Sequence, residues 1–321
     1  MIKILFDLLQ FLYSALPLIT CVTAFTLLSV LLSKSIKKYA IVYYIVLGLP
    51  FVMVAIPFIG RIFGVETFGF SRVPFLGGII RDYIHAGTFG FPLLIIIMYM
   101  GALNPRISWV NKLMSIRKEL SIISGFPIFT HSLIRVSNNF PKALKYFTHH
   151  DEYMETAKVV NETGAWISNF SFVLGIVLLI IFIPLWVTSF DSVRKRMGGV
   201  KWKKLQKWSY VLYALLFIHA VCIQVGGILN PRGGSGGGRA PVENIQNVRG
   251  QSAGTADYPS VKNKISANAE KDGRGQSAGA ADIKINPRTK QYIHLISLVL
   301  IFGSYLYLRL RKRKKHQGQR I

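Results

Sequence analysis

The sequence predicts an all-α integral membrane protein, built as a bundle of about seven transmembrane helices. Hydrophobic residues make up 51% of the 321 residues. They fall in blocks of about 20, the length at which a helix spans a ~30 Å hydrocarbon core. Acids are few, 14 against 39 Lys and Arg, giving a formal net charge of +25. The expected helices cover residues 8–33, 39–60, 86–103, 119–137, 164–188, 207–229 and 291–310.

The positive charge lies in short loops beside the apolar blocks, which favours membrane topology over nucleic-acid binding as its explanation. Four basic segments alternate along the chain as the loops of one membrane side would. Their cations are Lys34, Lys37 and Lys38; Arg106, Lys112, Arg117 and Lys118; Arg194, Lys195, Arg196, Lys201, Lys203, Lys204 and Lys207; and Arg309, Arg311, Lys312, Arg313, Lys314 and Lys315. The positive-inside rule places this side in the cytoplasm, with the N-terminus outside and the C-terminus inside.

Residues 230–290 differ in kind from the other loops. The segment opens with NPRGGSGGGRAP, is rich in Gly, Ser, Ala and Asn, and has almost no aromatic residues. Such a composition buries too little apolar surface to offset the entropy of ordering. We expect a disordered loop on the outer side.

Two absences in the sequence limit the chemistry. Cys21 and Cys222 both lie inside apolar blocks, so we expect buried thiols rather than a disulfide or a cysteine-rich metal site. There is no dinucleotide fingerprint and no strand–helix alternation. If the chain moves electrons, it therefore needs a cytoplasmic reductase or a membrane quinol as donor.

Two histidines at membrane depth are the candidate chemical groups. His131 lies 13 residues after Lys118, and His219 lies 12 residues after Lys207. At 1.5 Å rise per residue, both imidazoles stand roughly 18–20 Å from the inner surface, on two parallel helices. This geometry suits two axial ligands of one haem iron. Histidines that hydrogen-bond to neighbouring helices or relay protons are the alternatives that depth alone leaves open.

The neighbouring sequence resembles the bacterial ferric-reductase-like transmembrane family, and within it the MsrQ-like haem-binding membrane subunits. A basic residue 14 positions before a histidine is found at Arg117 and His131. The second similarity to the family is a longer motif. An apolar helix ends in Thr-Ser and is followed by a basic loop with the pattern Arg-x-x-Gly-x-x-Trp-x-x-Leu. A Tyr comes next, with a His nine residues after it. Here these are Thr188, Ser189, Arg196, Gly199, Trp202, Leu205, Tyr210 and His219. The resemblance covers about 80–229 well and the last helix loosely.

The resemblance implies one b-type haem per chain, ligated by His131 and His219, in a bacterial inner membrane. It implies a ferric-reductase-like core at 39–229, an extra helix at 1–38, and a last helix with a basic tail at 291–321. Electrons would pass to an extracytoplasmic acceptor such as ferric iron, a periplasmic reductase or a flavoprotein. The chain would then be the membrane haem subunit of a ferric- or methionine-sulfoxide-reductase-like oxidoreductase.

The sequence departs from the two-haem members of the family at two positions. These members carry a second histidine where this chain has Arg117 and Gln206, so the inner haem is expected to be absent. A quinone or flavin near Arg117, Lys118, Gln206 and Trp208 could bridge the gap as an inner donor site. His85 and His294 lie at the outer ends of their helices and are candidates for a secondary outer site. Histidines that lie at the membrane interface with the polar end of the ring in water would account for both positions as well.

Two other classes of protein fit the hydropathy. One is a cofactor-free transporter or channel with the histidines in a proton path, which Pro127 and Pro184 could assist by kinking helices. The other is a membrane scaffold that docks partners through its basic loops. A visible spectrum of the purified protein separates both from a haem protein.

Overall fold

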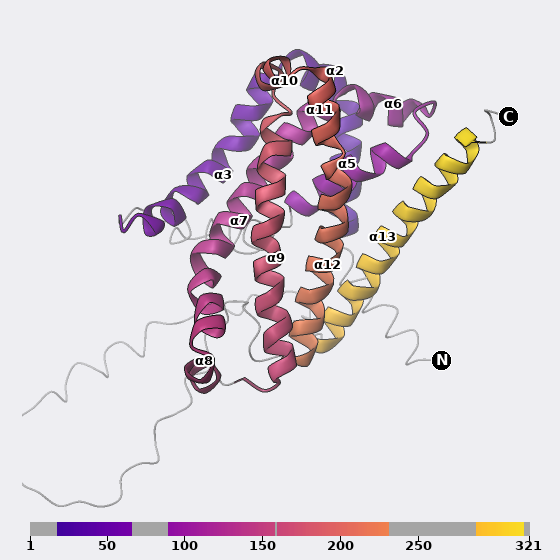
Figure 1. Ribbon diagram of the computed structural model, residues 1–321. Helices are drawn as coiled ribbons and strands as arrows, with labels where there is room; N and C mark the ends of the chain where they lie inside the picture. The colour runs from indigo at the N-terminus through magenta and orange to yellow at the C-terminus, as the bar shows by residue number, and fades with distance from the viewer. Residues whose placement is uncertain (1–17, 66–88, 158, 231–286, 318–321) are drawn as a thin grey trace, which may run out of the picture. The chain divides into compact units, whose positions relative to one another are not determined.

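A computed structural model describes residues 18–65, 89–157, 159–230 and 287–317 (Figure 1). Every regular element in these ranges is a helix, which confirms the predicted all-α class. Five segments are long and apolar enough to cross a membrane. They are α3 (Ala40–Ile62), α7 (Arg117–Thr148), α9 (Glu162–Val187), the segment Gly199–Leu229 and the segment Thr289–Lys314.

The expected count of seven spans is not confirmed in the described ranges. Two expected spans coincide with shorter apolar helices, Leu18–Leu31 and α5 (Gly90–Ala102), and both helices adjoin parts of the chain that the structure does not describe. The predicted outer loop lies almost entirely outside the described residues. Cys21 and Cys222 are free thiols, and both are partly buried rather than buried as expected.

The composition of the helices explains where they begin and end. In α9, the Asn161 side chain accepts a hydrogen bond from the Gly164 amide at 2.7 Å, which caps the first turn. Its apolar run continues to Val187, after which the Thr188 hydroxyl donates to the Pro184 carbonyl at 2.7 Å. The segment Gly199–Leu229 comprises α11 (Gly199–Gln206) and α12 (Trp208–Leu229).

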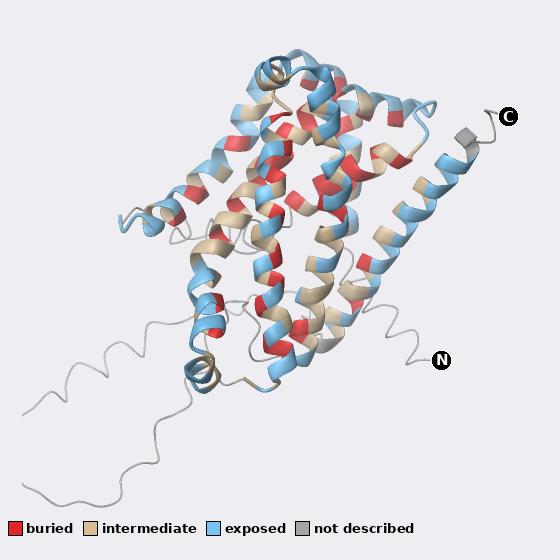
Figure 2. Ribbon diagram, viewed as in Figure 1, coloured by how far each residue is buried: buried red, intermediate tan, exposed pale blue. Residues whose placement is uncertain are grey.

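Helix α9 packs along α12 and also contacts α7, so it is the common neighbour of the two histidine-bearing helices. Helix α7 further packs against α3 and α5, and α13 (Pro287–Gln317) packs against α12 and α5. The described part of α5 is buried along most of its length (Figure 2). Large apolar side chains on α3 and α13 are exposed, as lipid-facing surfaces would be.

The basic segments gather at one end of these helices, which we call the basic end. It contains α2 (Ser33–Lys38), α6 (Ser108–Ser115), α10 (Asp191–Met197), α11 and the last turns of α13 (Figure 1). Lys118 at the start of α7 donates to Asp191 of α10 at 2.8 Å, and Lys312 of α13 donates to the Leu103 carbonyl after α5 at 2.9 Å. Helix α8 (His150–Thr156) lies at the opposite end. This arrangement agrees with the predicted alternation of loops.

Candidate functional site

The best-defined histidine is His219, 11 residues into α12 and roughly 17 Å from the basic end. Its Nδ1 lies 2.7 Å from the Ser171 carbonyl oxygen of α9. A carbonyl oxygen can only accept, so Nδ1 carries the hydrogen and donates it. In a neutral imidazole this leaves Nε2 with a free lone pair. A backbone carbonyl that fixes the tautomer in this way is typical of metal-ligating histidines.

Gly175 provides the room for this ring. A Cβ at position 175 would lie 3.0 Å from Cε1 of His219, closer than side chains normally approach. Gly175 follows Ser171 by one helical turn, so both residues lie on the face of α9 that receives the imidazole. Helix α9 therefore accommodates His219 in two ways. The Ser171 carbonyl accepts its hydrogen bond, and Gly175 has no side chain in the space that the ring occupies.

His131 lies on α7, 14 residues after the helix begins at Arg117, and is partly buried. One turn further along α7 is Arg135, also partly buried. The Arg135 guanidinium is close enough to His219 to act on its imidazole electrostatically. Arg135 of α7 and His219 of α12 therefore lie near enough for their charges to interact. Ionisable residues inside membrane spans often have a functional role, so Arg135 is itself a candidate.

Helix α7 is fixed against α9 by an inserted tryptophan. The indole of Trp186 donates from Nε1 to the Ile122 carbonyl oxygen at 3.0 Å. A Cβ on Gly125 would lie 1.8 Å from the same nitrogen, so only glycine lets the indole enter. The Phe126 and Phe129 rings pack against the indole, with centroids 5.7 and 6.3 Å away. This contact sets the position of His131 relative to α9, and so to His219.

The motif residues between α9 and α12 have a structural role at the basic end. The Trp202 indole donates to the Thr188 carbonyl oxygen at 3.1 Å, and the Arg194 guanidinium lies over the Trp202 ring, 5.7 Å from its centroid. The Gln206 amide reaches the Thr188 hydroxyl at 3.5 Å. Gln206 stands where two-haem relatives carry a histidine, and here its side chain bonds to the turn after α9.

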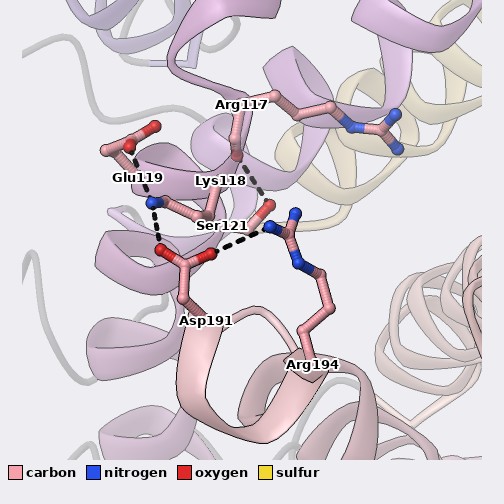
Figure 3. A network of polar contacts seen from close by, with 6 residues as sticks. All are labelled: Arg117, Lys118, Glu119, Ser121, Asp191 and Arg194. Atoms are coloured by element: carbon pink, nitrogen blue, oxygen red, sulfur yellow. Dashed lines mark hydrogen bonds and ion pairs between the residues drawn. The ribbon is translucent and has the colours of Figure 1, made fainter. Parts of the chain in front are cut away.

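The four residues predicted as an inner donor site have different surroundings in the structure. Lys118 binds Asp191 at 2.8 Å and Glu119 at 3.3 Å, while the Arg117 guanidinium extends away from this network (Figure 3). The hydrogen bond from Lys118 lowers the pKa of the Asp191 carboxyl. Trp208 is 52% exposed. Of the four, Arg117 lines a cavity with residues of α12 and α13, and a donor site at this end stays a prediction.

The predicted secondary outer site is less defined. His85 lies outside the described residues. His294 is partly buried in the early part of α13, one turn after Gln291. A Cβ on Gly227 of α12 would lie 2.3 Å from the Gln291 amide nitrogen, so α13 approaches the end of α12 closely here. A role for either histidine in an outer site stays a prediction.

The donor set can be tested against a haem. In the described residues no group of three or more His, Cys, Asp or Glu could hold a metal ion. A haem iron takes its equatorial ligands from the porphyrin and needs only axial ligands from the protein. A histidine with a free Nε2, a second histidine at similar depth on α7 and a partly buried guanidinium for an acidic substituent fit such a group.

In the described ranges every regular element is a helix and five segments are candidate spans, which supports a multi-pass membrane protein. Residues 86–217 match the family described as the ferric reductase like transmembrane component. The match confirms for this range the family resemblance that the sequence indicated, while the MsrQ-like subtype is not confirmed. The matched range includes His131 but ends two residues before His219.

Three curated relatives are similar to parts of the chain. An uncharacterized protein of Treponema pallidum is 28% identical over 191 residues, 59% of this chain and 46% of that protein. The magnetosome protein MamZ of Magnetospirillum gryphiswaldense is 26% identical over 178 residues, 54% of this chain and 24% of its own length. MamZ of Paramagnetospirillum magneticum is 28% identical over 178 residues, again 54% of this chain and 25% of the relative. The chain thus matches less than half the length of each, and no solved structure matches it.

Proposed function

We propose that the chain is a b-type haem protein that passes electrons across the membrane. His131 and His219 would supply the axial nitrogens, and the haem would supply the one-electron chemistry. The observation that carries this proposal is the hydrogen bond from His219 Nδ1 to the Ser171 carbonyl, which leaves Nε2 available to iron. The match of residues 86–217 to a ferric-reductase-like family supports a redox role.

Arg135 would have a second part in holding the group. A haem carries two carboxylate-bearing propionates, and a guanidinium pairs well with a carboxylate. Arg135 lies one turn after His131 and acts on His219 electrostatically, so it is near both proposed ligands. Its positive charge would stabilise the reduced haem relative to the oxidised form, which carries one more positive charge. The residue would therefore both anchor the group and raise its reduction potential.

The direction of transfer follows from the charge rule. We place the basic end in the cytoplasm of a bacterial cell, with the N-terminus outside and the C-terminus inside. The donor would be a cytoplasmic reductase or a membrane quinol, and the acceptor an extracytoplasmic partner such as ferric iron, a periplasmic reductase or a flavoprotein. The protein would then serve as the membrane haem subunit of a ferric- or methionine-sulfoxide-reductase-like oxidoreductase.

Spectra of purified variants test the ligand pair. We expect His219→Ala and His131→Ala each to change the iron spin state or lose the haem, because one bond must hold what two held. His149→Ala is the control, since His149 lies beside α8 at the far end and bonds to Thr148. A haem spectrum that survives the loss of either proposed ligand would refute the pair. A wild-type protein without haem would instead favour a cofactor-free transporter with histidines in a proton path.

A further inference from the structure

A cavity of about 190 Å³ opens at the basic end between α5, α7, α12 and α13. It lies where Arg117 begins α7, and so at one of the two positions where this chain lacks a second inner histidine. Arg117 lines it from α7, Ser209, Tyr210 and Tyr213 from α12, and Arg309 and Lys312 from α13. The cavity is therefore assembled from helices that are distant in the sequence.

The lining is strongly cationic. Arg117, Arg309 and Lys312 supply three positive charges, and no acidic residue is among the described residues around the cavity. None of the three cations forms an ion pair with a carboxylate in the described ranges. Three like charges around one cavity repel one another, which an anion between them would relieve.

Part of this charge has a structural use. Arg309 donates to the Gly101 carbonyl at 2.8 Å, and Lys312 donates to the Leu103 carbonyl at 2.9 Å, so both cap the C-terminal turn of α5. Capping does not satisfy the whole group, because the Nε of Arg309 is buried without a hydrogen-bond partner in the described structure. The Arg117 side chain makes no hydrogen bond within the described ranges, and in Figure 3 it extends away from its neighbours.

The hydroxyl of Tyr210 adds a neutral donor to these cations. Its oxygen accepts a hydrogen bond from Arg309, which leaves its own hydrogen free to donate. Guanidinium, ammonium and phenol donors together match a tetrahedral oxyanion, and arginine binds phosphate in a bidentate manner. The volume is below the roughly 300 Å³ of pockets that hold drug-sized ligands. A phosphate group fits this volume.

We propose that this cavity binds a phosphate group at the basic end of the bundle, held by Arg117, Arg309 and Lys312 with the Tyr210 hydroxyl. The phosphate could belong to an acidic lipid headgroup, which the basic surface of a membrane protein attracts, or to a soluble phosphate compound. The site goes beyond the proposed electron transfer and does not depend on bound haem.

Arg117→Gln is the decisive variant, because it removes a charge that has no structural partner in the described ranges, and Arg117→Lys restores the charge. Lys112→Gln is the matched control, since Lys112 is an exposed cation of α6 at the same end and does not line the cavity. Losing a charge-assisted hydrogen bond should weaken binding about ten-fold or more. The haem content per chain should stay unchanged in all three variants, so failure of this site is distinguishable from failure of the haem proposal.

Two arms separate the sources of the phosphate. In the first, native mass spectrometry compares the lipids retained from nanodiscs of phosphatidylglycerol and of phosphatidylcholine. In the second, protein in phosphatidylcholine nanodiscs is titrated with inorganic phosphate at constant ionic strength, and thermal unfolding reports binding. A lipid headgroup is supported if the protein retains phosphatidylglycerol and if Arg117→Gln weakens this retention while Lys112→Gln does not. Saturable stabilisation by phosphate with the same pattern supports a soluble ligand. Equal behaviour of Arg117→Gln and wild type in both arms overturns the proposal.

Discussion

Gly125→Ala should loosen the contact that sets α7 against α9. The new Cβ would lie 1.8 Å from Nε1 of Trp186, so the indole must leave its seat. The loss comprises the hydrogen bond to the Ile122 carbonyl, about 1 kcal/mol, and ring packing against Phe126 and Phe129, about 0.5–1.5 kcal/mol each. Together these amount to about 2–4 kcal/mol. Alanine regains about 1 kcal/mol of helix propensity, so a net loss of about 1–3 kcal/mol is expected.

Unfolding of the purified protein in detergent, followed by circular dichroism, measures this loss. Gly303→Ala is the matched control, because it is also a helical glycine and a Cβ there would meet nothing within 4 Å. The control should be as stable as wild type or slightly more so. If Gly125→Ala unfolds at the wild-type midpoint, the Trp186 insertion does not hold α7 in place. The positions of His131 and His219 would then need another explanation.

Three further predictions concern the charge of Arg135, the ion pair of Asp191 and the membrane topology. Arg135→Gln should lower the haem midpoint potential by roughly 60 mV or more, which is a ten-fold change in the equilibrium constant for one electron. Arg61→Gln is the control, because it loses a hydrogen bond to α7 outside the proposed site and should leave the potential unchanged. Equal potentials in Arg135→Gln and wild type would remove Arg135 from the site. Lys118 lowers the pKa of the Asp191 carboxyl. The stability that this ion pair contributes is therefore complete above the ordinary carboxyl pKa and is lost as pH falls through the folded pKa. Asp191→Asn should cost less than about 1 kcal/mol at pH 7 and nothing below the folded pKa, and a cost that does not change with pH would refute the pairing. In a background without native cysteines, Thr156→Cys should be labelled from outside intact cells and Lys201→Cys only after lysis; the reverse pattern would invert the topology.

The spans were predictable from sequence because each is a local property. A run of apolar residues of membrane length forms a helix wherever it occurs, and the ends of α9 follow from Asn161 and Thr188. The five candidate spans of the structure are of this kind. The other two predicted spans coincide with shorter apolar helices, and each of these helices adjoins residues that the structure does not describe. There, hydropathy alone defines the boundary.

The packing of the site was not predictable in the same way. Gly125 and Gly175 are ordinary small residues in the sequence, and their importance comes from Trp186 and His219, which arrive from other helices. Arg135 is recognisable in the sequence as a cation inside a span, but its proximity to His219 depends on how α7 and α12 both pack against α9. The cavity unites Arg117 with Arg309, almost two hundred residues later, which no local pattern could indicate.

The proposed haem is tested most directly by its stoichiometry. The full chain is expressed with haem supply and purified, and a pyridine haemochrome assay measures the haem per chain. We predict one b-type haem, because His131 and His219 form one ligand pair and the inner positions hold Arg117 and Gln206. Two haems per chain would contradict the expected loss of the inner haem at Arg117 and Gln206. A protein that folds and purifies without haem would contradict the proposed function itself.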